Sequence, residues 1–485
     1  MGLSALALLG RFLLCVLLLL VGSTAQADRP DTANSSEPFR FLPSDVIESY
    51  DSPAGTFRIF YTRDGKNAVP LADSNADGIP DRIAKLALLY EQVAVFYQNR
   101  GFRAVLSDEN NAGPHGGDGR FDIYLLDFGK SADGAYRRES CDVQERCSGF
   151  IVQENDFKGY GYPSLDYGDR VLASHEFFHA VQAAYDNSET TIFSEGTAVW
   201  ATEQFDASLA DLEGFVAGYL DRPDRSLYLP QAGPVDPFSY GASIFFQFLS
   251  ERFSSTIVEE LWTASDGDSD WFTALDPILA DHGSSFASAF VEFATWNLAT
   301  AARADPPSSY AGGAAYPLVK VTAVALPLDN PAQRIFPSAT VYLGTAPAGR
   351  SRLAAELVFP DAPDGVDSTQ LRLRVALRTG NQIAAPKEST DGKTLAIDVG
   401  SAEEAIFMLV NTKTSGESIR PALCIGTEAE VAACATPYRP DQPITTPPVN
   451  SGGCNAAPRG NLDGAALLIG LVMMALRFRN KRQSS

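Results

Sequence analysis

The sequence predicts an α+β fold followed by an all-β sandwich domain. Between residues 55 and 302, a few alternating strand patterns come first and a series of helical patterns follows. From residue 316 to 437, Gly, Pro and Asp interrupt short runs rich in Val, Leu and Ile, which is typical of a β-sandwich. The composition, with 45% hydrophobic and 20% charged residues, is that of a globular protein and excludes a fibre or a wholly disordered chain.

The net negative charge of the chain argues against nucleic acids as partners. The chain has 485 residues, of which 38 are basic and 60 acidic, and its formal net charge is −22. An acidic surface repels phosphate backbones, so we expect no nucleic-acid partner. The six cysteines are too few for a disulfide-dense scaffold, so the core must come from ordinary burial of apolar side chains.

The first 27 residues have the pattern of a secretory signal peptide. Arg11 precedes an apolar run over 12–22, and the small-x-small sequence at 25–27 fits a cleavage site. The alternative is a membrane anchor, for which the run is short. We therefore expect export to the outside of the cell or to its surface. Residues 28–54 are polar and contain proline, and they read as a leader or a short pro-segment.

The end of the chain has the pattern of a sorting tail. Residues 438–450 form a Pro-rich linker, and the tail over 451–485 contains Cys454, an apolar stretch over 465–476 and a basic cluster. The arrangement resembles bacterial C-terminal sorting tails of the Gly-Cys type found in myxobacteria. That resemblance implies a tail that engages the membrane or sorting machinery and is then removed. The alternative is a plain tail anchor.

An exported protein forms disulfides, and the sequence leaves four cysteines for them once the signal peptide and the tail are set aside. Four cysteines allow three pairings. Short separations favour Cys141 with Cys147 and Cys424 with Cys434, each as a local staple. A zinc–cysteine cluster is the rival interpretation, but neither pair has C-x-x-C spacing.

The first strands and the first helix follow from side-chain periodicity. Phe57, Ile59 and Tyr61 recur at every second position, which predicts a strand. Apolar residues recur at helical spacing over 81–99, directly after Pro80, which predicts a helix.

The remaining elements are expected from the same two periods. Further strands are expected at 121–126 and 150–152, and helices at 170–185, 195–205, 239–253, 257–263 and 286–301. The sandwich strands are expected at 318–324, 339–343, 353–359, 371–377, 394–399 and 405–410.

The segment from His175 to His179 carries the strongest chemical signal. It reads H-E-F-F-H inside the expected helix over 170–185. Positions i and i+4 share one face of a helix, so both imidazoles can reach one metal ion. Glu176 follows the first histidine, where a carboxylate can act as the general base. The chain has only four histidines, so a chance occurrence of this motif is improbable.

Zinc in a catalytic site needs a third protein ligand. Glu195 lies sixteen residues after His179 at an expected helix start, and a short polar loop would bring it back to the two histidines. The alternative for Glu195 is an acid that interacts with the helix dipole. Glu203, two turns further along the same helix, is the second choice, and His115 and His282 are also possible.

These motifs resemble those of the gluzincin metallopeptidases, in which an H-E-x-x-H helix is followed by an E-G-x-A helix that supplies the third ligand. More narrowly, the chain resembles a family of secreted metalloproteases of myxobacteria and related bacteria. The matching segments are residues 73–81, 116–124, 175–182, 240–245 and 293–297. The resemblance implies a gluzincin-like zincin catalytic domain over 55–302 with zinc as its cofactor. One departure is Phe193, where a tryptophan is expected.

A turn rich in Asp and Asn precedes the helix over 81–99. Asp73, Asn75, Asp77 and Asp81 place oxygen ligands around Gly78, as in the first part of a calcium loop. The glutamate that completes an EF-hand is missing, so calcium would bind weakly. The alternative is a turn that caps the following helix.

Two further side chains are candidates for supporting roles. Tyr240 can donate a hydrogen bond to an oxyanion, although the Phe-rich helix favours the alternative of a core tyrosine. Gln182 lies one turn after His179 and can orient that ligand.

The sequence therefore predicts a zinc-dependent peptidase that acts on a polypeptide substrate. In this interpretation His175, His179 and Glu195 hold zinc, and Glu176 takes a proton from water and delivers it to the leaving amine. One alternative is a non-catalytic surface protein for binding or adhesion with an idle zinc helix. Another is zinc-dependent hydrolysis of a non-peptide amide or ester.

Overall fold

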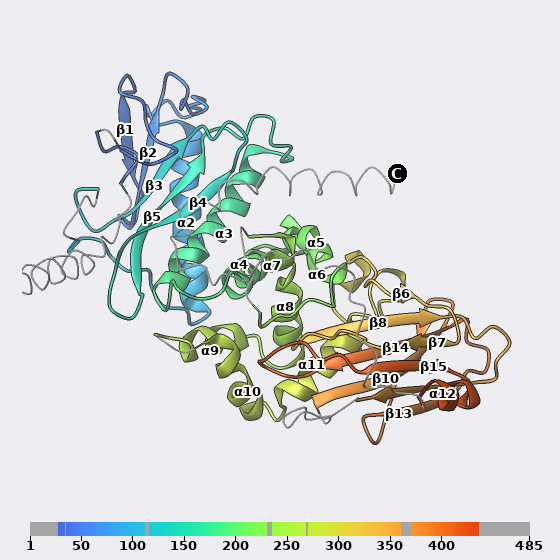
Figure 1. Cartoon of the computed structure of the whole chain (residues 1–485). Helices are drawn as coiled ribbons and strands as arrows, with labels where there is room; N and C mark the ends of the chain where they lie inside the picture. Colours follow the sequence, from blue (N-terminus) through green and yellow to red (C-terminus); the bar gives the residue numbers. More distant parts are fainter. Residues whose placement is uncertain are drawn as a thin grey trace, which may run out of the picture.

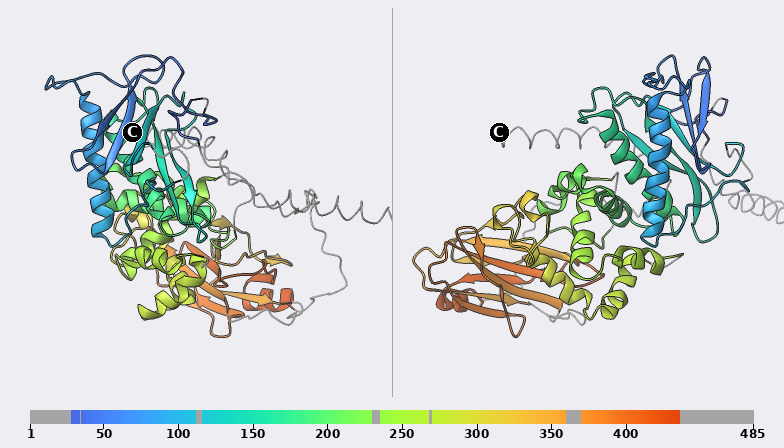
Figure 2. Two further views of the ribbon diagram at one scale, coloured as in Figure 1. Left: turned by 90° about the vertical axis from the view of Figure 1, so that its left-hand side faces the viewer. Right: turned by 180° about the vertical axis from the view of Figure 1, so that it is seen from behind.

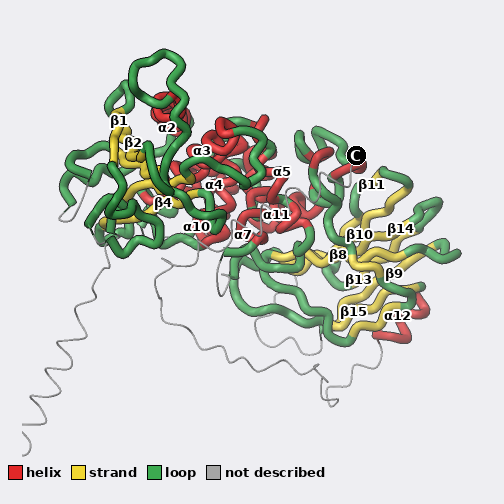
Figure 3. Tube along the Cα trace, turned by 90° about the horizontal axis from the view of Figure 1, so that it is seen from above, coloured by secondary structure: helices red, strands yellow, loops and turns green. Residues whose placement is uncertain are grey.

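The computed structural model describes residues 28–33, 35–111, 116–229, 235–267, 270–359 and 370–435. The expected signal peptide, linker and sorting tail lie outside the described residues. The described chain is a mixed α and β structure in which a first sheet and a pair of C-terminal sheets lie at opposite ends, with helices between them (Figures 1 and 3).

The first sheet has five strands. They are β1 (Ile47–Asp51), β2 (Phe57–Thr62), β3 (Phe121–Leu126), β4 (Gly134–Cys141) and β5 (Cys147–Glu154), in the spatial order β1-β2-β3-β5-β4. The central strands β2, β3 and β5 are parallel, whereas β1 and β4 are antiparallel edge strands. The expected strands at 57–61, 121–126 and 150–152 are therefore confirmed, but β1 and β4 were not expected.

Two long helices cover one face of this sheet: α2 (Asp81–Asn99) and α3 (Leu165–Ala183) (Figure 2). Side chains of alternate strand positions, such as Ile59 and Ile123, pack against Tyr90 of α2 and Phe177 of α3. The bounds of α2 are those expected. By contrast, α3 begins five residues earlier than expected, because Ser164 caps its first turn.

Residues 28–54, which the composition suggests are a leader, form part of the first sheet. They supply β1, which pairs along its whole length with β2. They also supply Arg29, whose buried guanidinium forms ion pairs with Asp108, Asp122 and Glu139. A short polar segment can therefore be fixed by charge pairing, which hydrophobic periodicity does not reveal.

The middle of the chain is helical. Its elements are α4 (Thr191–Phe205), η1 (Ala207–Leu209), α5 (Asp211–Phe215), α6 (Ala217–Leu220), α7 (Pro237–Gly241), α8 (Ser243–Arg252), α9 (Ile257–Ala264), α10 (Trp271–Asp281) and α11 (Phe286–Trp296). The single helix expected over 239–253 is thus divided between α7 and α8 at Ala242. Short turns η2 (Ala301–Arg303) and η3 (Gly313–Ala315) lead to the C-terminal sheets.

The C-terminal part consists of two sheets that share a core. The first of these two sheets contains, in spatial order, β11 (Gln382–Ile383), β10 (Leu371–Thr379), β14 (Glu404–Asn411), β8 (Ala339–Thr345) and β6 (Thr322–Ala323), and β12 (Lys387–Glu388) also pairs with β10. The second contains β13 (Thr394–Asp398), β9 (Arg352–Val358), β15 (Ala422–Gly426) and β7 (Leu328–Asn330). Leu373 and Phe407 of the first sheet meet Leu357 and Leu423 of the second. This arrangement agrees with the expected sandwich, and α12 (Glu428–Ala435) follows the last strand.

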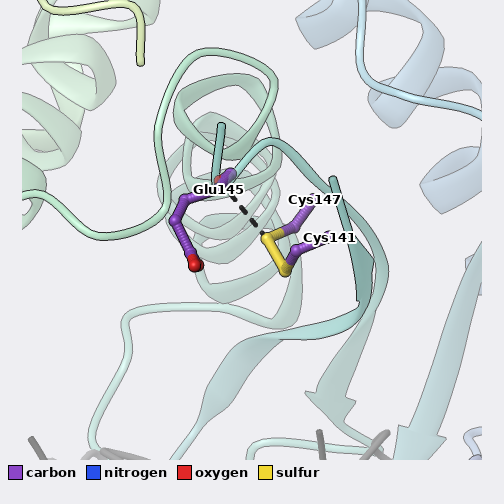
Figure 4. Close-up of side chains that lie close together, drawn as sticks. All are labelled: Cys141, Glu145 and Cys147. Carbon is purple, nitrogen blue, oxygen red and sulfur yellow. Dashed lines mark hydrogen bonds between the residues drawn. A yellow bond between two sulfur atoms is a disulfide. The ribbon is translucent and has the colours of Figure 1, made fainter. Parts of the chain in front are cut away.

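Both expected disulfides are present. Cys141–Cys147 closes the turn between β4 and β5, where the Sγ atom of Cys147 also contacts the backbone carbonyl of Glu145 (Figure 4). Cys424–Cys434 joins β15 to α12. Within the described residues, no helix has the combination of length and apolar character that crossing a membrane requires.

Candidate metal centre

The two histidines of the H-E-x-x-H motif lie on one face of α3, as the helical spacing predicts. Their Nε2 atoms are 3.2 Å apart. Both residues are more than four-fifths buried, since their side chains are 11% and 16% exposed. The helix packs against α2, β4, β5 and α4, and this packing fixes the direction of the two imidazoles.

Helix α4 supplies the third side chain. It begins at Thr191 behind the cap Thr190, four residues earlier than the sequence indicates, so Glu195 lies in its second turn. The loop over 184–190 reverses the chain, and α4 then packs along α3. The Oε2 atom of Glu195 lies 3.4 Å from Nε2 of His175 and 3.5 Å from Nε2 of His179.

These three side chains fit a metal ion. Their ligand atoms lie within 4.8 Å of one another. Oε2 of Glu195 is buried and has no hydrogen-bond partner among the described residues. Such an atom is costly to bury unless a cation compensates it. Two nitrogens and one oxygen are the donors that zinc accepts in catalytic sites with three protein ligands.

The electrostatics of the trio also favour a positive charge. Burial alone would lower the pKa of His179, but the charge of Glu195 outweighs it and raises the pKa to about 9. Burial raises the pKa of the Glu195 carboxyl, but the two histidines outweigh this effect and hold the pKa at about 2. The carboxylate is therefore ionised and faces the histidines.

Gln182 orients His179, as its position in the sequence suggests. Its Nε2 donates to the carbonyl of Ser194 at 2.8 Å and to Oγ1 of Thr197 at 2.9 Å. A carbonyl can only accept, so the amide oxygen of Gln182 must face Nδ1 of His179, 2.7 Å away. Nδ1 therefore carries the proton, and the lone pair of a neutral His179 is left on Nε2.

Glu176 lies beside the three candidate ligands, on the side of strand β4. Its Oε2 accepts the backbone N–H of Tyr136 at 2.8 Å. Burial raises the pKa of its carboxyl, and the adjacent histidines oppose the shift. A raised pKa brings a carboxylate closer to the working range of a general base. The contact with Tyr136 depends on the edge strand, and nothing in the sequence signals it.

Tyr240 lies beside His175 and also packs against the Phe-rich core. Its ring is stacked on that of His175, with centroids 6.2 Å apart, and on that of Phe215 at 5.1 Å. Burial raises the pKa of its hydroxyl well above the ordinary value, and Glu195 and Glu176 add to the shift. The hydroxyl is thus protonated and able to donate a hydrogen bond.

Two glycines set the position of Tyr240. A methyl group on Gly241 would meet the backbone nitrogen of Tyr219 at 2.4 Å, and one on Gly218 would meet the carbonyl oxygen of Pro237 at 1.8 Å. Only glycine permits this close approach of α6 and α7. The close contact of α6 with α7 is therefore a tertiary feature that helical periodicity does not show.

The other candidate ligands lie elsewhere. Nε2 of His282 pairs with Oε2 of Glu260 at 2.8 Å, and His115 lies outside the described residues. Glu203 is two turns away from Glu195 on α4 and is not part of the cluster. The two other groups of potential ligands contain disulfide-bonded cysteines, which have no thiolate to offer a metal.

In the expected calcium loop, side-chain oxygens bond to the loop itself. Asp73 accepts the backbone N–H groups of Asp77 and Gly78, and Asp81 accepts the backbone N–H and the hydroxyl of Ser74. Asn75 donates to Asp77. These contacts stabilise the turn that precedes α2, but the first turn of that helix receives no side-chain cap hydrogen bond. Calcium at this loop stays a prediction.

Phe193, the departure from the expected tryptophan, is accommodated in the core. Its ring stacks between Trp262, at 4.1 Å, and Trp271, at 4.9 Å. The indole nitrogen of Trp262 donates to Oγ1 of Thr197, which also accepts from Gln182. The stack therefore supports the group that orients His179. The sequence did not single out Trp262 or Thr197 for this role.

Comparison with known proteins adds little to these observations. The chain matches no protein-family model and no curated protein. Among solved structures it was aligned with a family GH115 4-O-methyl-α-glucuronidase that has specificity for decorated arabinogalactans, with 10% identity and a TM-score of 0.15. The alignment covers 68% of this chain and 54% of the glucuronidase, so the chain spans about half the length of that enzyme.

Proposed function

We propose that the protein is a zinc-dependent peptidase with His175, His179 and Glu195 as its metal ligands. The observation that carries the proposal is the convergence of three ligand atoms within 4.8 Å of one another, one of them a buried carboxylate oxygen without a hydrogen bond. The orientation of His179 by Gln182 supports it, because a metal ligand usually has its second nitrogen fixed in this way. Zinc, when bound, would act as a Lewis acid that polarises the substrate carbonyl and acidifies water.

Glu176 is the general base in this proposal. Its carboxylate takes the proton of the attacking water and later delivers it to the leaving amine. The backbone N–H of Tyr136 holds Oε2, and this contact fixes the direction of the carboxylate. In this proposal the protonated hydroxyl of Tyr240, whose ring stacks on His175, donates a hydrogen bond to the developing oxyanion.

The edge strand β4 favours a peptide over another amide or ester. Among the described strands, β4 pairs only with β5, so its other edge faces the α3 side, where Tyr136 meets Glu176. An extended peptide can add to such an edge through main-chain hydrogen bonds. The strand would then carry the substrate past the general base.

Export belongs to the same proposal. The two disulfides are typical of proteins that fold in an oxidising compartment. They agree with the signal-peptide pattern of residues 1–27, and retention at the cell surface follows from the resemblance of the tail.

The experiment that tests the proposal compares the zinc-loaded wild type with Glu176→Gln on a library of quenched peptides. The amide keeps the volume of the side chain but cannot accept a proton at neutral pH, so we expect hydrolysis to fall by about 10²–10⁴-fold. Zinc content and thermal melting should be retained. Equal hydrolysis by both proteins would exclude this mechanism. A folded, zinc-loaded wild type that cleaves no peptide would favour the non-catalytic binding protein.

A further inference from the structure

The start of the described chain packs on the face of the five-stranded sheet that lies opposite α2 and α3. We call residues 28–33 and 35–41 the N-terminal strap. Phe41 packs with aromatic side chains of β2 and β3 in a small core that is separate from the one under the helices. The ring of Phe39 stacks on that of Phe128, which follows β3, at 4.1 Å. The strap is therefore a built part of the sheet.

Arg29 of the strap joins two strands that are not neighbours. In the five-stranded sheet, β5 lies between β3 and β4. The guanidinium of Arg29 lies over the ring of Phe150 on β5, 5.5 Å from its centroid. From there it pairs with Asp122 of β3, and it donates to both carboxylate oxygens of Glu139 on β4, at 2.5 Å and 2.8 Å. The strap thus ties the edge strand β4 to the middle of the sheet across β5.

A β-bulge directs Glu139 toward the strap. Arg138 is paired with Gly149 and Ser140 with Ser148, so Glu139 is the extra residue on β4. A bulge takes its residue out of the ladder and changes the direction of the side chain. The side chain of Glu139 is fully buried. Its two parallel contacts with a guanidinium fix the distance and the orientation of both groups.

A second ion pair holds β4 two residues away from the first. Arg137 donates to Oε1 of Glu37 at 2.9 Å, and their side chains are only 14% and 6% exposed. Burial shields such a pair from the solvent that weakens exposed ones. Arg137 directly follows Tyr136, whose backbone N–H donates to the proposed general base Glu176. A shift of β4 would carry this N–H away from the carboxylate.

We propose that Arg29 and Glu37 are positioning residues, which hold β4 where it binds the peptide substrate and orients Glu176. This inference rests on the proposed peptidase function and adds the N-terminal strap to it. Among the described strands β4 pairs only with β5, so it lacks the restraint that a second neighbouring strand gives. The strap supplies that restraint from the far face of the sheet. Activity therefore requires a segment whose composition suggests a removable leader.

The test uses the full zinc-loaded chain with Arg137→Gln, which breaks the pair with Glu37 and leaves the contacts of Arg29 in place. It compares kcat/KM for a short peptide and for a longer peptide that can extend along β4, both with the same scissile bond. A charged hydrogen bond is typically worth about tenfold or more, so we expect the advantage of the longer peptide to fall by about that factor, mainly through KM. Partial unfolding would lower kcat for both peptides equally and leave the advantage unchanged.

Exchanging the charges separates positioning from loss of structure. Glu37→Arg and Arg137→Glu each bring like charges together, and each should reduce the advantage of the longer peptide. The double variant restores the pair in reverse and should recover most of it. Arg29→Lys keeps the positive charge but not the two parallel contacts with β4, so it should also reduce the advantage. Arg63→Gln is the matched control and should change nothing, because its pair with Glu48 lies at the opposite edge of the sheet.

Hydrogen exchange keeps this inference separate from the peptidase proposal. Mass spectrometry without substrate should show amides of β4 exchanging about tenfold faster in Arg137→Gln, and those of β2 unchanged. If the wild type cleaves nothing, this local change would still support the restraint of β4 and contradict the peptidase alone. Unchanged exchange in β4, equal acceleration in β2, or a wild type that cleaves both peptides equally well would overturn the inference. A double variant no better than its single variants would overturn it too.

Discussion

Gln182 makes three hydrogen bonds that together define the chemical state of His179. Two of them, to Ser194 and Thr197, fix the amide so that its oxygen meets Nδ1 of the imidazole. Because Trp262 also donates to Thr197, the orientation of a proposed metal ligand depends on side chains from α4 and α9. Under the proposed function, the metal affinity would therefore depend on residues that do not touch the metal.

We predict that Gln182→Leu lowers zinc affinity by about 10–100-fold, since His179 loses the acceptor that fixes its tautomer. Competition with a chromophoric chelator measures the change. Gln204→Leu is the control, because Gln204 lies on α4 and bonds only to Gln247 among the described residues. An unchanged affinity in Gln182→Leu would show that this hydrogen bond does not support metal binding.

The ligand set itself gives a second prediction. His175→Ala, His179→Ala and Glu195→Ala should each lose more than about 100-fold in zinc affinity, because removing a ligand costs more than removing its support. Glu203→Gln should bind zinc as the wild type does. Metal analysis after dialysis against a weak chelator checks the ranking. Retention of zinc by Glu195→Ala together with its loss in Glu203→Gln would move the third ligand to Glu203.

At the scale of elements, helix α4 carries two glutamates that lie in different surroundings. Glu195 and Glu203 lie eight residues apart, which is about 12 Å along a helix. The first therefore faces the histidines of α3. The second is near Glu213 and Asp211 of α5, and burial together with their charges raises its pKa to about 7.

The raised pKa of Glu203 makes stability depend on pH. The folded protein holds this proton more tightly than the unfolded chain, whose value is near 4.5, so stability is lost as pH rises from about 4.5 to about 7. Glu203→Gln removes the effect. We expect the melting temperature of the variant, relative to that of the wild type, to increase as the pH rises through this range. Above it, the difference between the two melting temperatures should stay constant. A constant difference at every pH would contradict the shift.

At the scale of the whole molecule, the helical core extends onto the outer face of one sheet of the sandwich. Strand β14 is buried on both faces: Met408 packs with the helical core, and Leu409 packs between the two sheets. Hydrogen bonds also join the sandwich to helix α11. The Tyr342 hydroxyl donates to the carbonyl of Ala294 at 2.7 Å, and Arg374 donates to Oγ1 of Thr295 at 2.6 Å. The sandwich is thus continuous with the part that holds the site.

We predict that the two parts unfold together. Met408→Ala and Leu409→Ala each remove a buried side chain, from opposite faces of β14, and each should lower the free energy of unfolding by about 2–5 kcal/mol. Both should shift the same single transition, which calorimetry and tryptophan fluorescence can follow. Two transitions, with each variant affecting a different one, would show that the sandwich is an independent unit.

The sequence by itself determined the elements whose pattern is local. Residues close together in the sequence show the helical period of α2, the alternation of the first strands and the continuous apolar run of β14. The spacing of His175, Glu176 and His179 on one helix is equally local. For the same reason the disulfides over short separations were predictable.

Only the tertiary structure decided which distant groups meet. The contact of Glu176 with Tyr136 and the stacking of Tyr240 on His175 join segments far apart in the sequence. The burial of Arg29 among three acids likewise depends on the folded sheet. Periodicity reports which face of an element is buried, but packing and charge pairing select its partners across the fold.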